Sequence, residues 1–575
     1  MGKYSIEKNA QVLLAVLKAN RIRKVIVSPG TTNISLVVSM VNDGSFEMYS
    51  AVDERGAAYM ACGLSSESGE PVVITCTGAT ASRNYYPGLT EAYHRKLPIL
   101  AVTASQDFSR CGNLSPQFID RSVQPRDSVR LSVQIPIVRS AEDEYDATLK
   151  INTAVLELFR HGGGPVHINM ASNYSNDFSV DDLLHVRIIR RLYVGEKFPE
   201  IPKYDKIAIA VGNHKRFTEQ LTRLIDKFCE LHNAIVIVDH SSHYWGKYRI
   251  LPTIISCQEK HKTDLFDFDL LIHIGEEHGD YYTEPALKQA KTVWRISPDG
   301  EIRDPFKKLT HVFEMQEEDF FSYYTKNTTN SKVRHDYLDA IRKEAESTYQ
   351  QIPELPFSNI WIAKQTIPRI PADVCLELGV SNTMRAWTFF DFPKETYVLA
   401  NTGCRGIDGA IPTLIGMSLA HQEMIHYAVM GDLTFFYSFN TLGNRHITDN
   451  LRIMLINNGC GAEFNIYPNR AYKIYEGNHE KINEFVAAGG HTGTKSKQLV
   501  KHYAEDLGFM YLTASNKDEY LKILPVFMSQ ERKQSIIFEV FTKVEDENEA
   551  LKLIRNIKID TSAMIKGKIK TLMGR

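Results

Sequence analysis

The chain has 575 residues, which is too long for a single hydrophobic core and predicts several domains of roughly 150 residues each. Hydrophobic residues make up 43% and charged residues 24%, so the composition excludes a disordered or low-complexity chain. The 67 Lys and Arg residues nearly balance the 69 Asp and Glu residues, and a net charge of −2 creates no global attraction to nucleic acid or to an anionic membrane. We therefore expect small-molecule partners, with no nucleic acid and no membrane.

The sequence has neither a run of 18 apolar residues nor an apolar signal core near its start, so a cytoplasmic location is expected. Its eight cysteines include no C-x-x-C pair, which argues against a zinc ribbon or a disulfide framework. We expect reduced thiols that are mostly buried.

Short apolar runs alternate with amphipathic stretches through the first 185 residues. Strands are predicted at 24–27, 71–75, 98–102 and 164–169, and helices at 32–41, 54–65 and 79–93. Continuous apolar strands joined by helices are typical of a parallel sheet that is covered on both faces. The polar stretch 177–204 is predicted to be a linker.

Two further α/β units follow the linker. Strands are predicted at 207–211, 234–238 and 270–275, before a polar segment at 327–357, and then at 374–378, 396–400, 425–430, 453–456 and 535–540. The expected fold class is α/β with three parallel-sheet domains, at 1–185, 186–355 and 356–575. The first and third units could share one fold.

The sharpest local motif is Gly431-Asp432-Leu433 at the end of an apolar strand, with Asn457-Asn458-Gly459 at the end of the next one. If the two strands are parallel, Asp432 and Asn457 lie at the same edge of the sheet. Carboxylate and amide oxygens suit Mg²⁺, and a helix beginning after Asp432 favours a diphosphate group. The alternative is that Asp432 and Asn457 only cap helices and turns.

Further motifs accompany this pair in a fixed order: Ser28-Pro29-Gly30, Asp53-Glu54-Arg55, Thr77-Gly78-Ala79-Thr80-Ala81 and Asn84-Tyr85-Tyr86-Pro87. In this order they resemble the thiamine-diphosphate enzymes of the 2-oxo acid decarboxylase and acetolactate synthase superfamily. The resemblance implies a pyrimidine-binding, a central and a diphosphate-binding domain, with thiamine diphosphate and Mg²⁺ as cofactors. FAD, which some relatives carry in the central domain, is not expected, because no sequence feature there supports it.

Within this superfamily the chain most resembles the menaquinone-pathway synthases that make 2-succinyl-5-enolpyruvyl-6-hydroxy-3-cyclohexene-1-carboxylate. The shared features are G-D-L in place of G-D-G, the segment Asn401 to Gly409, the turn Ser381-Asn382-Thr383, and Gln117 late in the first domain.

The resemblance assigns roles residue by residue. Glu54 is the acid that contacts the aminopyrimidine ring and promotes loss of the cofactor's C2 proton, and Gln117 is a second catalytic residue. Asp432, Asn458 and the backbone carbonyl of Cys460 would bind Mg²⁺. The other implied cofactor-binding residues are Ser28, Pro29, Gly30, Thr77, Asn84, Thr383, Ile407, Gly431, Leu433 and Phe464, of which Ile407 holds the cofactor in its bent conformation.

For two of these residues a purely structural role remains an alternative. Glu54 could be a surface residue favoured by the helix dipole, and Ile407 could be an ordinary core residue.

The resemblance also has an implication for assembly. In this family the acid and the diphosphate motif come from different subunits, which implies a homodimer or homotetramer with active sites at the subunit interface.

The resemblance does not extend to the residues that bind the substrates. The menaquinone-pathway synthases bind two acidic substrates through arginines, which match carboxylates bidentately, but those positions hold Thr32, Gln106, Trp387 and Thr402 here. The predicted substrate residues are Thr31, Thr32, Gln106, Arg385, Arg405 and Glu463. Their polar character suits a polyhydroxylated acceptor such as a sugar, with Arg385 or Arg405 holding the donor carboxylate, although ordinary polar loop residues would look the same.

The expected function is decarboxylation of a 2-oxo acid with transfer of the acyl unit to an acceptor carbonyl. The alternatives are a simple decarboxylase that releases an aldehyde, the menaquinone-pathway synthase itself, and a non-catalytic partner subunit. The histidines within 239–243 are predicted to lie in a strand-end loop rather than a metal cluster. For the basic tail 551–575 a subunit contact or a solvated helix is favoured over membrane binding.

Overall fold

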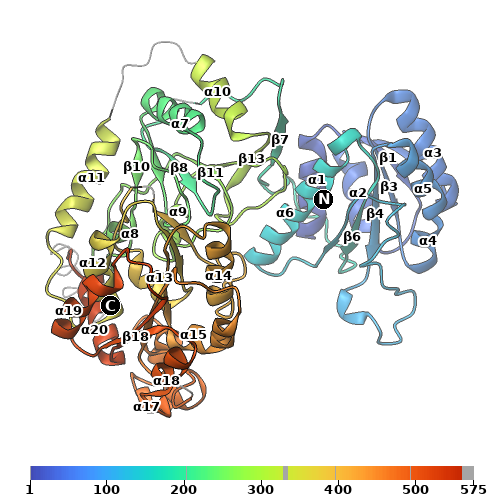
Figure 1. The fold of residues 1–575 in the computed structure, drawn as a ribbon. Coiled ribbons are helices and arrows are strands. Elements are labelled where there is room, and N and C mark those ends of the chain that lie inside the picture. The colour runs from blue at the N-terminus through green and yellow to red at the C-terminus, as the bar shows by residue number, and fades with distance from the viewer. Residues whose placement is uncertain (1, 202–203, 328–334, 395, 492–493, 560–575) are drawn as a thin grey trace, which may run out of the picture. The chain divides into compact units, whose positions relative to one another are not determined.

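The computed structural model describes residues 2–201, 204–327, 335–394, 396–491 and 494–559. These form two compact units, Met1–Leu192 with Thr310–Val312, and Tyr193–Leu309 with Phe313–Arg575 (Figure 1). Three sheets with flanking helices confirm the α/β class. The domain boundaries at 185/186 and 355/356 stay predictions, and residues 560–575 of the basic tail lie outside the described residues.

The first sheet has the order β2-β1-β3-β4-β6-β5, and every neighbouring pair is parallel. Figure 1 shows it between α1 and α6 on one side and α3 and α5 on the other. Its strands are β1 (Lys24–Val27), β2 (Glu47–Ser50), β3 (Val72–Cys76), β4 (Ile99–Ser105), β5 (Ser132–Ile135) and β6 (Val166–Ala171). Its helices are α1 (Lys8–Ala19), α2 (Ile34–Asp43), α3 (Glu54–Ser68), α4 (Ala79–Asn84), α5 (Tyr86–Arg95) and α6 (Ala141–Glu157).

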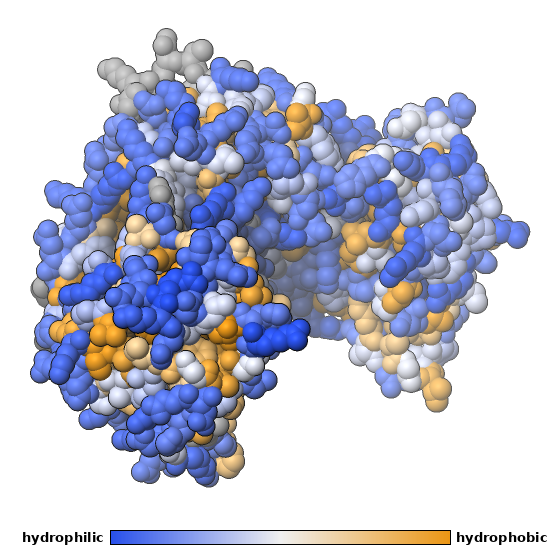
Figure 2. All heavy atoms as spheres, in the orientation of Figure 1, coloured by the Kyte–Doolittle hydropathy of each residue, from blue (hydrophilic) through white to orange (hydrophobic). Residues whose placement is uncertain are grey.

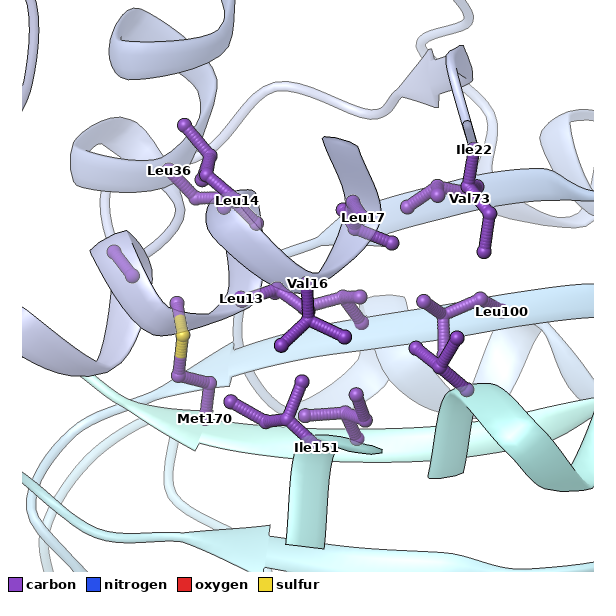
Figure 3. Packing of buried hydrophobic residues seen from close by; sticks show 14 of the residues in the cluster. Leu13, Leu14, Val16, Leu17, Ile22, Leu36, Val73, Leu100, Ile151 and Met170 are labelled. Atoms are coloured by element: carbon purple, nitrogen blue, oxygen red, sulfur yellow. The ribbon is translucent and has the colours of Figure 1, made fainter. Parts of the chain in front are cut away.

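The strands of this sheet are apolar on both faces because both faces are covered. Val73 of β3 and Leu100 of β4 pack against α1 and α6, close to Val16 and Ile151 (Figure 3). The next residue along β3, Ile74, packs on the opposite face in the cluster that includes α3 and α5. Continuous apolar runs therefore mark the inner strands, as predicted.

The second sheet has the order β10-β9-β8-β11-β12-β13-β7. Its strands are β7 (Arg190–Tyr193), β8 (Ile207–Val211), β9 (Ala234–Ile237), β10 (Arg249–Ile250), β11 (Leu270–Ile274), β12 (Val293–Ile296) and β13 (Leu309–Glu314). Its main helices are α7 (Glu219–His232), α10 (Glu317–Asn327) and α11 (Asp336–Tyr349), with the short α8 (Thr253–Ser256) and α9 (Glu284–Leu287).

The strand order reverses between β8 and β11, which is where such sheets commonly hold a dinucleotide. Here the loops that follow these two strands are in direct backbone contact. A Cβ on Gly212 would lie 2.0 Å from the carbonyl oxygen of Glu276, and the Glu276 N–H donates to the carbonyl of Asn213 at 2.9 Å.

The third sheet has the order β15-β14-β16-β17-β19-β18. When its strands are numbered from β14, this order is 2-1-3-4-6-5, which is also the order of the first sheet. The first and third predicted α/β domains therefore share a topology. Its strands are β14 (Cys375–Leu378), β15 (Tyr397–Leu399), β16 (His426–Gly431), β17 (Leu451–Asn457), β18 (Met510–Ala514) and β19 (Ile536–Phe541). Its helices are α12 (Asn359–Thr366), α13 (Asn382–Trp387), α14 (Ala410–Ala420), α15 (Asp432–Ser438), α16 (Arg470–Ile474), α17 (His479–Phe485), α18 (Leu499–Asp506), α19 (Lys517–Phe527) and α20 (Val544–Arg555).

Several elements differ from the sequence-based expectations, and no strand was predicted at β10, β12 or β13 of the second sheet. Strands β2, β5 and β18 were missed because each lies at or beside a sheet edge and is only partly buried. The stretch 177–204, predicted to be a linker, contains β7, the edge strand of the second sheet. Helix α11 lies in the polar segment 327–357, where only the face with Tyr337, Leu338 and Ile341 is buried.

Six of the eight cysteines are buried and all eight are free, as expected. No helix within the described ranges is long and apolar enough to cross a membrane.

Glu377 of β14 is fully buried, and neither carboxylate oxygen has a hydrogen-bond partner. Burial raises its pKa from 4.5 to about 8. Because the unfolded chain ionises first as the pH rises, stability is lost between about pH 4.5 and pH 8, by about 5 kcal/mol in total. We expect Glu377→Leu to raise the unfolding temperature strongly at pH 8 and only slightly at pH 5. An equal change at both pH values would contradict this account.

Candidate functional site

A cavity of about 180 Å³ lies at the carboxyl edge of the third sheet, where the strand order reverses between β14 and β16. Ligands of open α/β sheets bind at such reversal points. The wall is built from the segment after β14, the start of α15, the loop after β17, and two isolated residues. Its lining residues are Asn359, Val380, Ser381, Asn382, Thr383, Ile407, Gly431, Asp432, Leu433, Thr434, Ile456, Asn458, Cys460, Gly461, Ala462, Glu463 and Phe464.

Asp432 lies at the first position of α15, directly after β16. Its carboxylate accepts hydrogen bonds from the backbone N–H of Leu433 at 2.8 Å and of Gly459 at 2.6 Å. The residue is only 5% exposed, and burial raises the pKa of its carboxyl to about 7. A nearby cation would favour the ionised form of this carboxyl.

The loop after β17 is tied to Asp432 and to the neighbouring strand. Gly459 takes a left-handed conformation, with φ of 79°, which brings its N–H to the Asp432 carboxylate. The Asn457 amide donates to Glu539 of β19 at 2.7 Å, which fixes the strand end just before Asn458. The side chain of Asn458 lines the cavity and accepts from the Cys460 N–H at 3.4 Å.

Nine residues predicted from the sequence meet in this one cavity: Thr383, Ile407, Gly431, Asp432, Leu433, Asn458, Cys460, Glu463 and Phe464. Their individual roles stay predictions. Sequence reasoning missed Asn359, whose amide donates to Thr383 Oγ1 at 3.4 Å from the start of α12. Its only local signal is a helix-capping serine before it, which indicates a helix start and no site.

In the first sheet the strand order reverses between β1 and β3. The motifs that contain Gly30 and Thr77 follow these two strands. Gly30 lies against Thr77, since a Cβ on Gly30 would be 2.0 Å from the Thr77 methyl carbon. The Thr32 hydroxyl bonds the Thr77 hydroxyl and donates to the carbonyl of Ala104 at 2.9 Å. Thr32 is therefore engaged within the fold, while Thr31 beside it is exposed.

Glu54 is the first residue of α3 and is partly buried. The cap of this helix is provided by Asp53, whose carboxylate accepts from the N–H groups of Arg55 and Gly56 at 3.1 and 3.2 Å. The carboxyl of Glu54 is therefore not needed for capping.

The other predicted residues of the first unit are spread over its motif loops. Ser28 is buried, Pro29 and Asn84 are exposed, and Gln106 accepts from Ser115 Oγ at 3.2 Å. Gln117 is exposed in the loop between β4 and β5, with a left-handed φ of 60°.

Trp387 and Thr402 stand at two of the positions where the resemblance implies arginines, and both are buried. Trp387 is fully buried, and its indole N–H donates to Asn359 Oδ1 at 2.9 Å. Thr402 is 3% exposed and accepts from the Asn213 amide at 3.0 Å. Both side chains are therefore engaged within the fold, and neither supplies a positive charge.

The histidines at 239–243 make structural contacts. His240 Nε2 lies 3.0 Å from the carbonyl of Trp387, and His243 Nε2 lies 2.7 Å from the carbonyl of Val398. No group of three or more His, Cys, Asp or Glu side chains in the described part of the chain could hold a metal ion. A site built on Asp432 would therefore depend on amide, carbonyl and ligand oxygens.

Comparisons with known proteins place both motif regions in one class of enzyme. Residues 7–124 match the N-terminal TPP binding domain of thiamine pyrophosphate enzymes, and residues 379–533 match the C-terminal TPP binding domain. Thiamine pyrophosphate is the compound also called thiamine diphosphate.

Curated relatives match almost the whole chain. A protein of Bacteroides fragilis is 30% identical over 574 residues, covering 96% of this chain and 98% of the relative. Proteins of Phocaeicola vulgatus, at 29% identity, and Flavobacterium psychrophilum, at 26%, cover 96% and 93% of this chain and 98% and 96% of their own lengths. All three are named 2-succinyl-5-enolpyruvyl-6-hydroxy-3-cyclohexene-1-carboxylate synthase. The chain thus belongs to the thiamine pyrophosphate enzyme family, and it is a thiamine-pyrophosphate-dependent enzyme.

Proposed function

We propose that the protein decarboxylates a 2-oxo acid and transfers the acyl unit to an acceptor carbonyl, forming a new carbon–carbon bond. The observation that carries this proposal is the cavity that Asp432, Asn458 and Ile407 share with the ionisable Glu463. The relatives' name, which describes a synthase, favours bond formation over simple release of an aldehyde.

The cavity residues fit the cofactor and a magnesium ion. The carboxylate of Asp432, the amide oxygen of Asn458 and the carbonyl of Cys460 are hard oxygen ligands, and they would hold Mg²⁺. Ile407, in the turn before α14, would support the cofactor's ring system. When bound, thiamine pyrophosphate supplies a carbon nucleophile and an electron sink for the loss of CO₂.

Glu54 would hold and move the proton that activates the cofactor. We propose that it acts on the cofactor bound by another subunit, so that a homodimer or homotetramer carries its active sites at the subunit interface. Large apolar side chains are exposed on both units (Figure 2), among them Val52 and Tyr59 beside Glu54, and Ile474 and Phe485 in the second unit. A subunit contact would cover such residues.

The substrates would differ from the pair of acidic substrates that the resemblance to the menaquinone-pathway synthases implies. A buried carboxylate without a charged partner costs several kcal/mol, and the positions of Thr32, Trp387 and Thr402 offer no positive charge. Either Arg385 or Arg405 would instead attract the donor acid. The polar side chains of Thr31, Gln106 and Gln117 would suit a polyhydroxylated acceptor such as a sugar.

The test is a CO₂-release screen of small 2-oxo acids with thiamine pyrophosphate and Mg²⁺, run with and without a panel of aldoses and ketoses. We expect one acid to release CO₂ and its acyl carbons to appear in an acceptor adduct by mass spectrometry. Stoichiometric free aldehyde, unaffected by any acceptor, would identify a simple decarboxylase instead. Cofactor binding without CO₂ release from any acid would contradict the proposal.

A further inference from the structure

Two arginines meet on one tyrosine ring beside the cofactor cavity. The guanidinium carbon of Arg385 lies 4.2 Å from the ring centre of Tyr281, and that of Arg405 lies 4.4 Å from it. Arg405 also donates to the carbonyl of His278 at 3.3 Å. Cations placed over an aromatic ring are held by its quadrupole, so this arrangement fixes two positive charges close together.

The three residues come from separate segments, two of which also build the cavity. Arg385 lies on α13, two residues after Thr383, and Arg405 lies two residues before Ile407 in the turn that precedes α14. Thr383 and Ile407 both line the cavity. Tyr281 follows β11 of the second sheet. The charge cluster is therefore anchored to the cavity wall.

One of the two charges is already balanced. Glu463, which lines the cavity, pairs with Arg385 at 2.8 Å between Oε1 and Nη1. The side chains of the pair are 20% and 25% exposed, so the interaction is only partly screened by water. Within the described ranges Arg405 makes no ion pair. The cluster of Arg385, Arg405 and Glu463 thus carries one net positive charge.

We propose that Glu463 is a specificity-determining residue that restricts the enzyme to 2-oxo acids with a single carboxylate. This inference rests on the proposed function. One net positive charge attracts a monoanion toward the cavity. A second carboxylate would meet the negative charge of Glu463 and would find Arg385 already occupied, so it would enter the cavity without a counter-charge.

The test compares 2-oxopentanoate with 2-oxoglutarate, which have the same chain length and differ by one distal carboxylate. The wild-type enzyme should favour 2-oxopentanoate in kcat/KM. Glu463→Gln keeps the shape and a hydrogen-bond acceptor for Arg385 but removes the charge, and should shift the preference toward 2-oxoglutarate by about tenfold or more, mainly through KM for the dicarboxylate. Glu480→Gln, an exposed position on α17, makes the same change in net charge and should leave the ratio unchanged.

A second readout needs no turnover. Calorimetric titration of pentanoate and glutarate, the same two acids without the keto group, should show that Glu463→Gln gains affinity for glutarate relative to pentanoate. If the ratios of both assays in Glu463→Gln equal those of Glu480→Gln, or if wild type prefers the dicarboxylate, the inference is overturned while the proposed function stands. If no 2-oxo acid releases CO₂, the proposed function fails, and the glutarate-to-pentanoate ratio still decides the role of Glu463.

Discussion

Replacing Asp432 with alanine is expected to weaken the binding of thiamine pyrophosphate with Mg²⁺ by at least about 100-fold and to abolish turnover. Changes in residues that only support metal ligands commonly cost 10- to 100-fold, on the order of 2 kcal/mol, and a direct ligand should cost more. Among the residues that the structure describes, Asp432 and Glu463 are the carboxylates that line the cavity, and Asp432 also accepts a hydrogen bond from the N–H of Gly459. Calorimetric titration of the cofactor at saturating Mg²⁺ measures the loss.

A matched control is Asp506→Ala, at an exposed position at the end of α18. It should bind the cofactor as the wild type does. Thermal unfolding without cofactor shows whether Asp432→Ala still folds. If a folded Asp432→Ala protein bound the cofactor with near wild-type affinity, the cavity would not be the diphosphate site.

The second large effect is expected at Glu54. Glu54→Gln should lower kcat by roughly 10²- to 10⁴-fold, the usual range for loss of a positioned acid or base. Cofactor affinity should change much less, because the amide can still form a hydrogen bond with the ring. The role of Asp53 as the helix cap means that the substitution leaves the start of α3 intact.

Steady-state kinetics with the acid found in the CO₂ screen provides the measurement. Glu67→Gln, exposed near the other end of α3, makes the same chemical change far from the motif and should retain full activity. Equal activity of both variants would show that Glu54 is an ordinary first-turn glutamate.

Most of the buried strands could be predicted within one or two residues because burial on both faces leaves a simple signal. Strand β8 and strand β11, for example, are apolar at nearly every position, since helices cover both sides of their sheet. Strand β12 was missed although it is buried at every position, because Arg295 interrupts its apolar run. Strand β18 was not predictable in this way, because it is an edge strand in which only Ala514 is buried. The periodicity of α11 was diluted by charged residues on its outer face.

In the candidate site, too, some residues could be predicted from the sequence and others could not. Asp432 and Asn458 were predictable because each directly follows an inner strand, where topology decides which side chains meet. The contact between Arg385 and Glu463 was not, because the two residues are far apart in sequence and the packing of α13 against the loop after β17 brings them together. Tyr281 lies in no motif at all and is recognised only through the two arginines that it holds.

The position of β19 has a consequence for the order in which the site can form during synthesis. This strand enters the sheet between β17 and β18, and its Glu539 holds Asn457 beside the cavity. A nascent chain that has not yet emerged past residue 541 contains Asp432 and Asn458 but lacks the strand that anchors their loop. Because domains fold as units when their non-local strands become available, the cavity should be among the last parts of the protein to mature on the ribosome.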